Sequence, residues 1–243
     1  MQLVILASGR GSRLGSLTKK VPKGLIKIKN KPLILYNKNF FQLFKKKIIV
    51  TGYLSKEFIN NKHFKKFKIV QNKDYKTTNM VHSFFKVSRF VSKNLPIIIC
   101  YSDIIFDKKI YRNLAKVKGS GLLLYSKWLQ LWKKRMSIKK IKNDAENLVI
   151  KNGMIKEIGG SLLFNKLPKY QYTGIIKLTY KDFTNLKKIY FKKKDYNIDF
   201  TTFLNLAIKL KELKLKSIIT NRFWFEIDNR ADVEIFKNFL NKK

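Results

Sequence analysis

A short apolar run at residues 3–6 breaks directly into a loop that contains two glycines, Gly9 and Gly11. An apolar run this short, ended by glycine, predicts a buried strand rather than a helix. Glycines after such a strand let backbone N–H groups approach an anion without interference from Cβ atoms. Arg13 and Lys23 follow and supply charge that peptide groups lack. The opening of the chain therefore predicts a strand that leads into a phosphate-binding loop.

Two familiar phosphate-binding fingerprints do not describe this loop. A dinucleotide-binding fingerprint needs glycine where this chain has Leu14, and a P-loop continues into Gly-Lys-Ser/Thr, which does not follow here. We therefore expect another binding mode, with a nucleoside triphosphate as the ligand. The alternative is an ordinary glycine turn after a strand.

Residues 6–14 (LASGRGSRL), followed by PKGL at residues 22–25, resemble the signature of the nucleotidyltransferases that activate sugar phosphates and small alcohol phosphates. The resemblance covers nearly the whole chain, although its specific motifs lie mostly at the ends. It implies that Arg13 and Lys23 are catalytic cations. It also implies a set of nucleotide-binding residues, which are Leu6, Ala7, Ser8, Gly9, Gly11 and Ser12.

The composition fits one domain over residues 1–243. Of the 243 residues, 45% are hydrophobic and 14% aromatic, which is enough for one sizeable core, and no linker is visible. No stretch approaches the roughly 18 apolar residues of a membrane span, and the first strand leaves no room for a secretory signal. We therefore expect a cytoplasmic protein. The single cysteine, Cys100, excludes an intramolecular disulfide and is expected in a buried strand.

The formal net charge of +39 admits three interpretations. Basic surfaces bind nucleic acids through counterion release. However, the lysines are spread along the chain, arginine is scarce, and no nucleic-acid motif is present. We therefore favour a compositional bias of the surface and expect no specific nucleic-acid partner. An increased attraction for anionic substrates is the third interpretation.

Strand and helix patterns alternate through the first half of the chain. The expected strands are 3–6, 48–50, 67–71 and 96–101, with a helix from about 32 to 44 and another at 80–90. Such alternation predicts a mostly parallel sheet with helices on both faces, an α/β, Rossmann-like three-layer fold. Ligands bind at the carboxyl ends of such strands. The glycine loop, residues 77–83 and Asp103 should therefore meet at one edge.

The pattern changes between residues 122 and 178. Strands are expected at 122–125 and 172–178, with a hairpin over 147–158 that turns at Asn152 and Gly153. A helix follows at 181–190. We expect residues 122–178 to form a small β-rich lid next to the acceptor.

Two acidic positions predict a metal site. Asp103 follows an apolar strand, and Asp228 lies with Glu226 in a Glu-Ile-Asp motif late in the chain. Mg²⁺ prefers a few carboxylates together with phosphate oxygens and water. The resemblance implies Asp103 and Asp228 as Mg²⁺ ligands, although Ser102 stands where related enzymes have a glycine or a first acid. Glu226, on the same strand face as Asp228, is a third candidate ligand. The alternatives are a strand-end cap for Asp103 and a helix N-cap for Asp228.

Residues 77–83 resemble the Asn-x-x-x-Ser segment of phosphocholine and aminoalkylphosphonate cytidylyltransferases. This likeness implies that Asn79 and Ser83 bind the nucleotide, with the Asn79 amide pairing with a pyrimidine edge. Capping of the following helix is an equal alternative for Asn79. His82 is expected on the surface or in packing rather than in catalysis.

The middle of the chain supplies aromatic and acidic residues for an acceptor site. Aromatic faces attract ammonium groups, and a carboxylate adds counter-charge. The same resemblance implies Trp128, Trp132 and Tyr172 as walls of the site, with Glu146 or Asp199 as the counter-charge. The competing interpretation is that these aromatics pack the core of the lid.

These features predict a Mg²⁺-dependent nucleotidyltransferase that transfers CMP from CTP to a small phosphate or phosphonate, such as a phosphocholine-like acceptor, and releases pyrophosphate. The acceptor phosphate is already an anion, so no His or Cys catalyst is needed. A sugar-1-phosphate nucleotidyltransferase is the nearer alternative, and a basic nucleic-acid-binding protein is the distant one. The acceptor, the base of the nucleotide and the oligomeric state stay open.

Overall fold

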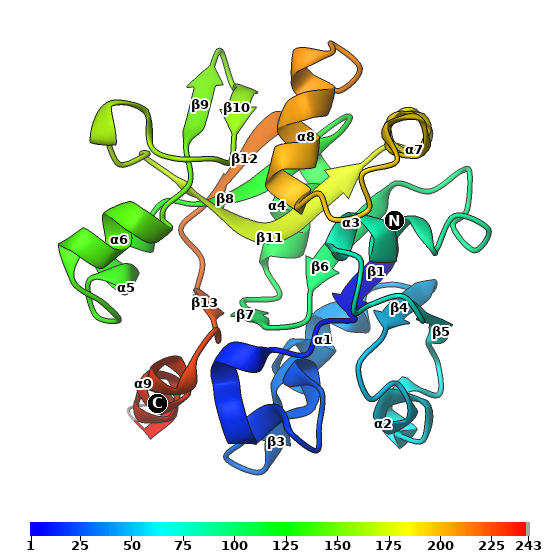
Figure 1. Ribbon diagram of the computed structural model, residues 1–243, viewed down its shortest axis with the longest axis vertical. Coiled ribbons are helices and arrows are strands. Elements are labelled where there is room, and N and C mark those ends of the chain that lie inside the picture. The colour runs from blue at the N-terminus through cyan, green and yellow to red at the C-terminus, as the bar shows by residue number, and fades with distance from the viewer. Residues whose placement is uncertain (242–243) are drawn as a thin grey trace.

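One nine-stranded sheet forms the centre of the computed structural model, which describes residues 1–241 (Figure 1). The strand order is β5-β4-β1-β6-β11-β8-β12-β10-β9. Strands β11 and β10 run opposite to the others, so the predicted mostly parallel sheet is confirmed. The strands are β1 (Gln2–Ala7), β4 (Lys47–Thr51), β5 (Lys68–Gln71), β6 (Ile97–Tyr101), β8 (Gly121–Tyr125), β9 (Leu148–Lys151), β10 (Met154–Ile158), β11 (Gln171–Leu178) and β12 (Lys216–Thr220).

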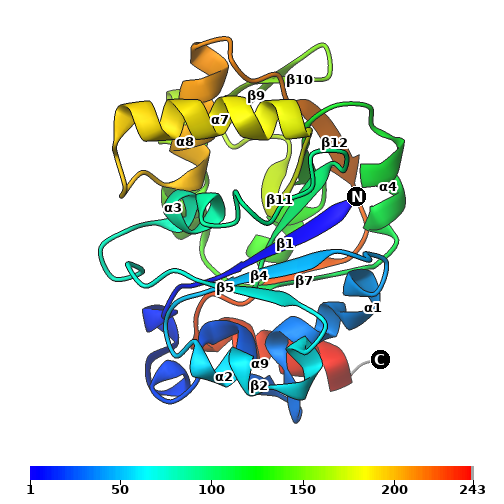
Figure 2. The same cartoon turned by 90° about the vertical axis from the view of Figure 1, so that its right-hand side faces the viewer.

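Helices cover both faces of the sheet, which confirms the expected three layers (Figure 2). Successive side chains of a strand point to opposite faces. Val4 and Leu6 of β1 therefore enter one core, whereas Leu3 and Ile5 enter the other. The first core is closed by α3 (Met80–Phe85), α7 (Tyr180–Lys193) and α8 (Phe200–Lys209). The second is closed by α1 (Lys38–Phe41), α2 (Lys56–Ile59), α4 (Ile110–Lys116), α5 (Trp128–Trp132) and α6 (Ile138–Asp144).

A smaller apolar cluster brings the two ends of the chain together. Leu14, just after the glycine loop, packs in one cluster with Phe225 and with Val233 of the last helix. Figure 1 shows these blue and red segments side by side. The surrounding elements are η1 (Ser12–Thr18), η2 (Lys23–Leu25), β2 (Lys27–Ile28), β3 (Lys31–Pro32), η3 (Leu33–Asn37), β7 (Ile104–Phe106), β13 (Trp224–Glu226) and α9 (Arg230–Asn241), and two further 3₁₀ turns are η4 (Lys62–Phe64) and η5 (Leu163–Asn165).

The region expected as a lid, residues 122–178, is built into the sheet instead. Strands β8 and β11 occupy the middle of the sheet, where helices cover both of their faces. The β9–β10 hairpin lies at the sheet edge, and its turn has positive φ at Asn152 (51°) and Gly153 (70°), as an Asn-Gly turn requires. The apolar pattern of a strand shows its burial but not which strands it pairs with, which is why the sequence misplaced this region.

Two expected helices are shorter than their patterns. Helix α3 ends at Phe85, because the next N–H groups reach back only three residues: Val87 donates to the Phe84 carbonyl at 3.2 Å and Ser88 to the Phe85 carbonyl at 3.1 Å. The Ser88 hydroxyl also donates to the Phe85 carbonyl at 2.6 Å and so competes with a helical hydrogen bond. The helix expected to run to about residue 44 begins as the 3₁₀ turn η3 and continues only briefly as α1.

Cys100 lies fully buried in β6, as expected, and this burial raises the pKa of its thiol. Among residues 1–241, no helix has both the length and the apolar character needed to cross a bilayer. The cytoplasmic location stays a prediction.

Candidate active site

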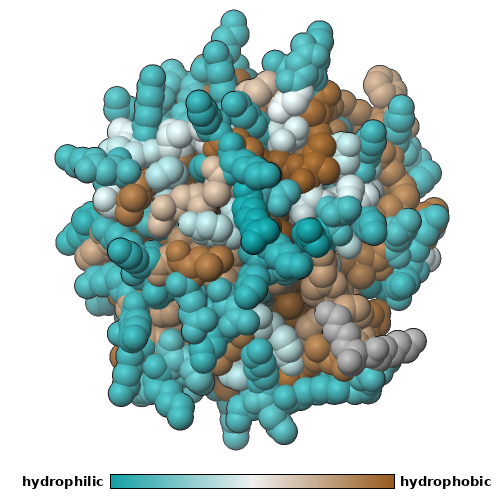
Figure 3. Space-filling model, turned by 180° about the vertical axis from the view of Figure 1, so that it is seen from behind, coloured by the Kyte–Doolittle hydropathy of each residue, from teal (hydrophilic) through white to brown (hydrophobic). Residues whose placement is uncertain are grey.

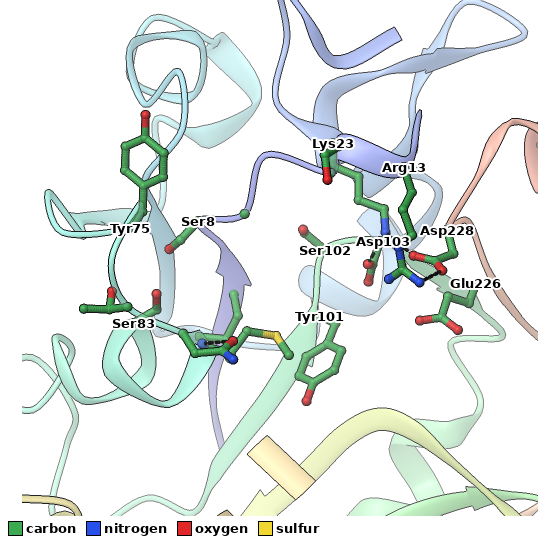
Figure 4. A pocket seen from close by; sticks show the side chains of 17 residues that line it. Ser8, Arg13, Lys23, Tyr75, Ser83, Tyr101, Ser102, Asp103, Glu226 and Asp228 are labelled. Atoms are coloured by element: carbon green, nitrogen blue, oxygen red, sulfur yellow. Dashed lines mark hydrogen bonds and ion pairs between the residues drawn. The ribbon is translucent and has the colours of Figure 1, made fainter. Parts of the chain in front are cut away.

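A pocket of ≈ 370 Å³ opens at the carboxyl ends of β1 and β6 (Figure 4). It gathers the glycine loop, the segment before α3 and Asp103, which were predicted to meet there. The sequence-predicted residues that line it are Leu6, Ser8, Gly9, Gly11, Ser12, Arg13, Lys23, Asn79, Ser83, Asp103 and Asp228. Ala7 is a correction, because the alternation along β1 turns its side chain into the second core, where it is 4% exposed.

The two glycines of the loop serve different purposes. Gly11 has a φ of 71°, and a Cβ atom there would lie 2.8 Å from the Cβ of Lys23, so glycine lets the loop pack against that side chain. A Cβ on Gly9 would meet nothing within 4 Å, so the space in front of it is open. Within residues 1–241, the N–H groups of Gly9 and Gly11 donate to no protein acceptor. The loop thus has donors available for an anion.

Local sequence directs Lys23 toward the end of β6. Pro22 is extended, with φ −69° and ψ 154°, and leads into η2, whose first residue is Lys23. A Cβ on Gly24 would lie 3.3 Å from the Cβ of Ser102, so a glycine there lets the turn approach the strand end closely. The Pro-Lys-Gly order therefore brings the Lys23 ammonium beside Asp103.

A two-stranded ladder brings the two predicted aspartates together. Strands β7 and β13 pair antiparallel, with Glu226 opposite Ile104. Beyond that pair, the N–H of Ile227 donates to the Asp103 carbonyl at 2.9 Å. Asp103 precedes β7 and Asp228 follows β13, so antiparallel pairing places both carboxylates at the same end of the ladder.

Lys23 bridges these carboxylates. Its Nζ lies 2.7 Å from Asp103 Oδ2 and 3.1 Å from Asp228 Oδ1, and Arg13 Nη1 lies 2.5 Å from Asp228 Oδ2. The Lys23 side chain is 12% exposed, whereas that of Arg13 is 74% exposed. Burial disfavours the charged ammonium, but the carboxylates outweigh this effect and raise the pKa of Lys23. Lys23 is therefore a fixed cation, whereas Arg13 is paired with Asp228 but exposes most of its side chain toward solvent.

The same carboxylates fit a divalent cation. Asp103 Oδ1 is buried and has no hydrogen-bond partner within residues 1–241, so it is available as a ligand. Glu226 lies beside the cluster, where burial, reinforced by repulsion from Asp103, raises its pKa to about 7. The described residues contain no cluster of three or more His, Cys, Asp or Glu that could hold a metal. Asp103 and Asp228 would thus bind an ion that takes its remaining ligands from phosphate and water.

Asn229, rather than Asp228, caps the start of α9, because its Oδ1 accepts a hydrogen bond from the Asp232 N–H at 3.2 Å. Asp232 Oδ2 accepts hydrogen bonds from the N–H groups of Asp228 at 2.9 Å and Asn229 at 3.1 Å. The Asp228 carboxylate instead faces Lys23 and Arg13. The capping alternative for Asp228 is therefore wrong.

Asn79 and Ser83 line the pocket at the start of α3. Asn79 caps this helix: its Oδ1 accepts from the Met80 N–H at 2.7 Å, and its Nδ2 donates to the Asn197 carbonyl at 3.1 Å. Ser83 Oγ accepts from Asn72 Nδ2 at 3.0 Å. The capping role is thus confirmed, and the contact of Asn79 with a base stays a prediction. His82 packs as expected, with Nδ1 2.7 Å from the Tyr190 hydroxyl.

A second pocket of ≈ 380 Å³ adjoins the first. The two pockets share a wall formed by Arg13, Met80, Tyr101, Glu226 and Asp228. A ligand in one pocket and a ligand in the other would therefore meet beside the cluster of Lys23 and the two aspartates. This geometry suits a reaction between two bound molecules.

The second pocket contains three of the four residues predicted for an acceptor, Trp132, Glu146 and Tyr172. Trp128 is a correction: it is 1% exposed, and its Nε1 donates to the Pro168 carbonyl at 3.2 Å. It packs edge-on against Trp132, with ring centroids 5.3 Å apart, and belongs to the second core. The core-packing interpretation therefore holds for Trp128.

One side of the second pocket is acidic. Burial raises the pKa of Glu146, although its Oε1 accepts a hydrogen bond from the Thr201 hydroxyl at 2.9 Å. Burial also opposes ionisation of Asp199, but hydrogen bonds from Thr202 and Thr201 outweigh it and lower the pKa of Asp199. Asp199 and Asp144 line the same pocket.

Sequence reasoning missed a buried ion pair behind the second pocket. Arg135 Nε lies 2.7 Å from Asp232 Oδ1 and Arg135 Nη2 lies 2.8 Å from Asp232 Oδ2, with side chains 3% and 1% exposed. Arg135 also lines the pocket. The one signal in the sequence was the use of arginine in a chain whose basic residues are mostly lysine.

The fold and the site define an α/β protein that has a glycine loop with available N–H donors at the carboxyl edge of its sheet and two adjoining pockets beside it. The chain belongs to the nucleotidyl transferase family, because that family's model matches residues 2–122 and a relative from the same class of enzymes matches nearly the whole chain. The chain is 32% identical over 254 residues to the CTP:phosphoglutamine cytidylyltransferase of Campylobacter jejuni. This alignment covers 97% of the chain and 98% of the relative. The predicted enzyme class, a nucleotidyltransferase, is thereby confirmed.

Two further comparisons agree with this assignment. A choline-phosphate cytidylyltransferase of Streptococcus pneumoniae is 32% identical over 118 residues, which cover 46% of this chain and 49% of the relative. The inositol-1-phosphate CTP transferase from T. maritima has the same fold, with a TM-score of 0.79 and 21% identity over 99% of this chain and 95% of that structure.

Proposed function

We propose that this nucleotidyltransferase transfers CMP from CTP to a small phosphorylated acceptor and releases pyrophosphate. The observation that carries the proposal is the shared wall of the two pockets, which places a buried lysine and two aspartates beside the point where two ligands would meet. Two relatives, a CTP:phosphoglutamine cytidylyltransferase and a choline-phosphate cytidylyltransferase, support the same choice.

The proposed reaction is one in-line displacement. An oxygen of the acceptor phosphate attacks the α-phosphorus of CTP, a new P–O bond forms, and the bond to pyrophosphate breaks with its electron pair leaving on pyrophosphate. No proton has to move, because the attacking oxygen is already an anion. Lys23 and Arg13 would stabilise the negative charge on the phosphates. Asp103 and Asp228 would hold a divalent cation, which we propose is Mg²⁺ and which neutralises phosphate charge when bound.

The nucleotide would lie in the first pocket and the acceptor in the second. We propose that Gly9, Gly11 and Ser12 bind the triphosphate, and that Asn79 and Ser83 contact the base. For the acceptor, the carboxylates of Glu146 and Asp199 favour a compound with an ammonium group, which the ring of Tyr172 would also contact.

A pyrophosphate-release screen tests this proposal. CTP, UTP, GTP and dTTP are each combined with phosphocholine, phosphoethanolamine, O-phosphoserine, aminoethylphosphonate, polyol phosphates and sugar 1-phosphates, with and without Mg²⁺. We expect release with CTP, Mg²⁺ and an amino-bearing acceptor. Preference for a sugar 1-phosphate would instead support a sugar-1-phosphate nucleotidyltransferase. No pyrophosphate release from any pair would contradict the enzyme activity proposed here.

A further inference from the structure

Among residues 1–241, three buried polar atoms of residues that line the second pocket have no hydrogen-bond partner: the Tyr172 hydroxyl and two N–H donors. Within residues 1–241, Arg135 Nη1 and Trp132 Nε1 are buried and contact no acceptor, although both side chains line this pocket. Their side chains are almost fully enclosed, with 3% of Arg135 and 6% of the Trp132 residue exposed. Buried donors are normally paired because leaving them unpaired is costly. The pair therefore points to a ligand that accepts hydrogen bonds.

The guanidinium of Arg135 is held in a fixed orientation. Asp232 binds its Nε and Nη2 in a bidentate pair, which leaves Nη1 as the remaining donor nitrogen. Its Cζ lies 5.7 Å from the ring centre of Trp132 and 5.6 Å from that of Phe225, so aromatic rings restrict its motion. A donor positioned in this way is suited to recognising an oxyanion.

The position of these donors separates them from the reacting phosphate. The phosphate must lie at the wall shared by the two pockets, whereas Arg135 and Trp132 line only the second pocket. Glu146, Asp144 and Asp199 line that same pocket. The second pocket thus offers donors for an anion together with carboxylates for a cation.

We propose that Arg135 and Trp132 form a subsite for a carboxylate on the acceptor. The acceptor class is then a phosphorylated amino acid or a close derivative, which carries a carboxylate and an ammonium group besides the reacting phosphate. This inference rests on the proposed function, because it assigns the second pocket to the acceptor. Arg135 and Trp132 are specificity-determining residues and take no part in the bond exchange.

A matched pair of acceptors isolates the carboxylate. O-Phosphoserine is phosphoethanolamine with one added carboxylate, so the two compounds differ only in the group that the subsite would bind. With CTP and Mg²⁺, we expect kcat/KM to be at least about tenfold higher for O-phosphoserine, the scale of one charge-assisted hydrogen bond. Equal turnover, or better turnover of phosphoethanolamine, would overturn the proposal.

Three variants then assign the effect to the subsite. Trp132→Phe keeps an aromatic ring, although a smaller one, and removes the N–H. Arg135→Lys keeps a positive charge beside Asp232 and removes the planar donor set. Each should lower kcat/KM for O-phosphoserine, through KM, about tenfold more than it lowers kcat/KM for phosphoethanolamine. Lys133→Arg is the matched control, because Lys133 is exposed on the same turn and this change, like the two test changes, keeps the net charge. Thermal denaturation of each variant shows whether it is folded.

Direct binding separates failure of this inference from failure of the proposed function. Calorimetry measures the affinity of the intact protein for O-phosphoserine and phosphoethanolamine in the presence of a non-hydrolysable CTP analogue and Mg²⁺. Tighter binding of O-phosphoserine that is lost in folded Trp132→Phe would support the subsite even where turnover is absent and the proposed transfer fails. No preference for O-phosphoserine, or equal losses for both compounds in the variants, overturns the subsite whatever the activity.

Discussion

The ammonium of Lys23 lies between two carboxylates, 2.7 Å from Asp103 Oδ2 and 3.1 Å from Asp228 Oδ1. An isolated buried ammonium would lose its charge, but Asp103 and Asp228 keep Lys23 charged in a nearly enclosed position. Electrostatic stabilisation is strongest where water is excluded and the charge is already in place. Lys23 therefore meets the requirements for stabilising a transferring phosphoryl group.

Lys23→Ala should lower kcat/KM by roughly 10²-fold or more, the scale of losing one charge-stabilising contact in a transition state. Steady-state pyrophosphate release with CTP and the best acceptor from the screen measures this effect. Lys20→Ala is the control, because Lys20 is exposed and its loss makes the same change in net charge. A folded Lys23→Ala enzyme with near-normal turnover would remove Lys23 from the mechanism.

The two aspartates lead to a different prediction. Asp103→Asn and Asp228→Asn should each lower Mg²⁺-dependent turnover by roughly 10² to 10³, because the amide keeps the shape of the side chain and loses its charge. Turnover measured across a Mg²⁺ titration checks this. Asp107→Asn serves as the control, since Asp107 directly follows β7 and, within residues 1–241, its carboxylate accepts only from the N–H of Lys109. If Asp228→Asn changes thermal stability alone, the metal must have another ligand.

At the scale of elements, strand β1 and its loop act as one unit. The strand is fixed in the middle of the sheet by β4 and β6, and the loop starts where these pairings end. The Cβ positions of its glycines differ: that of Gly11 is filled by Lys23, whereas that of Gly9 is open toward the pocket. The same substitution at the two glycines should therefore have two different effects.

Gly11→Ala should destabilise the protein by about 1 kcal/mol or more, because alanine is strained at φ 71° and its Cβ would collide with Lys23. Gly9→Ala should leave stability unchanged and raise the KM for CTP, because the new methyl group enters the space proposed for the triphosphate. Chemical denaturation and nucleotide-dependent kinetics test both. Equal loss of stability in the two variants would contradict the open space in front of Gly9.

The whole molecule carries a charge of +39, and its lysines are distributed rather than gathered. Figure 3 shows hydrophilic side chains over most of one face, with apolar patches between them. A diffuse surface of this kind attracts anions without offering a binding pattern for bases. The enzymatic site is different, because its charges are directed contacts in a pocket.

Binding of duplex DNA or RNA should accordingly be weak, show no sequence preference and fall steeply with salt. CMP transfer should persist at salt concentrations that abolish this binding, because screening affects buried contacts less than exposed ones. Both activities are measured across one salt series. Tight, sequence-selective nucleic-acid binding at physiological salt, with no pyrophosphate release from any nucleotide, would favour a nucleic-acid-binding protein instead.

The sequence by itself determined the local features of this protein. The apolar run, the glycine loop, Pro22-Lys23 and the acidic residues after two strands were readable because each depends on a few neighbouring residues. Their meeting at one edge was predictable as well, since parallel strands end on the same side of a sheet. The Asn-Gly hairpin was predicted correctly too, because its turn depends on neighbouring residues.

Only the tertiary structure decided which strands pair and which side chains face a pocket. The patterns of β8 and β11 predicted strands but not their place in the middle of the sheet. Trp128 and Trp132 looked alike in the sequence, and packing buried both but left only Trp132 at the wall of the pocket. The role of Arg135 could not be predicted from the sequence, because its partner, Asp232, lies far along the chain in α9. These outcomes depend on contacts between distant segments, whose geometry is set by packing of the whole core rather than by local sequence.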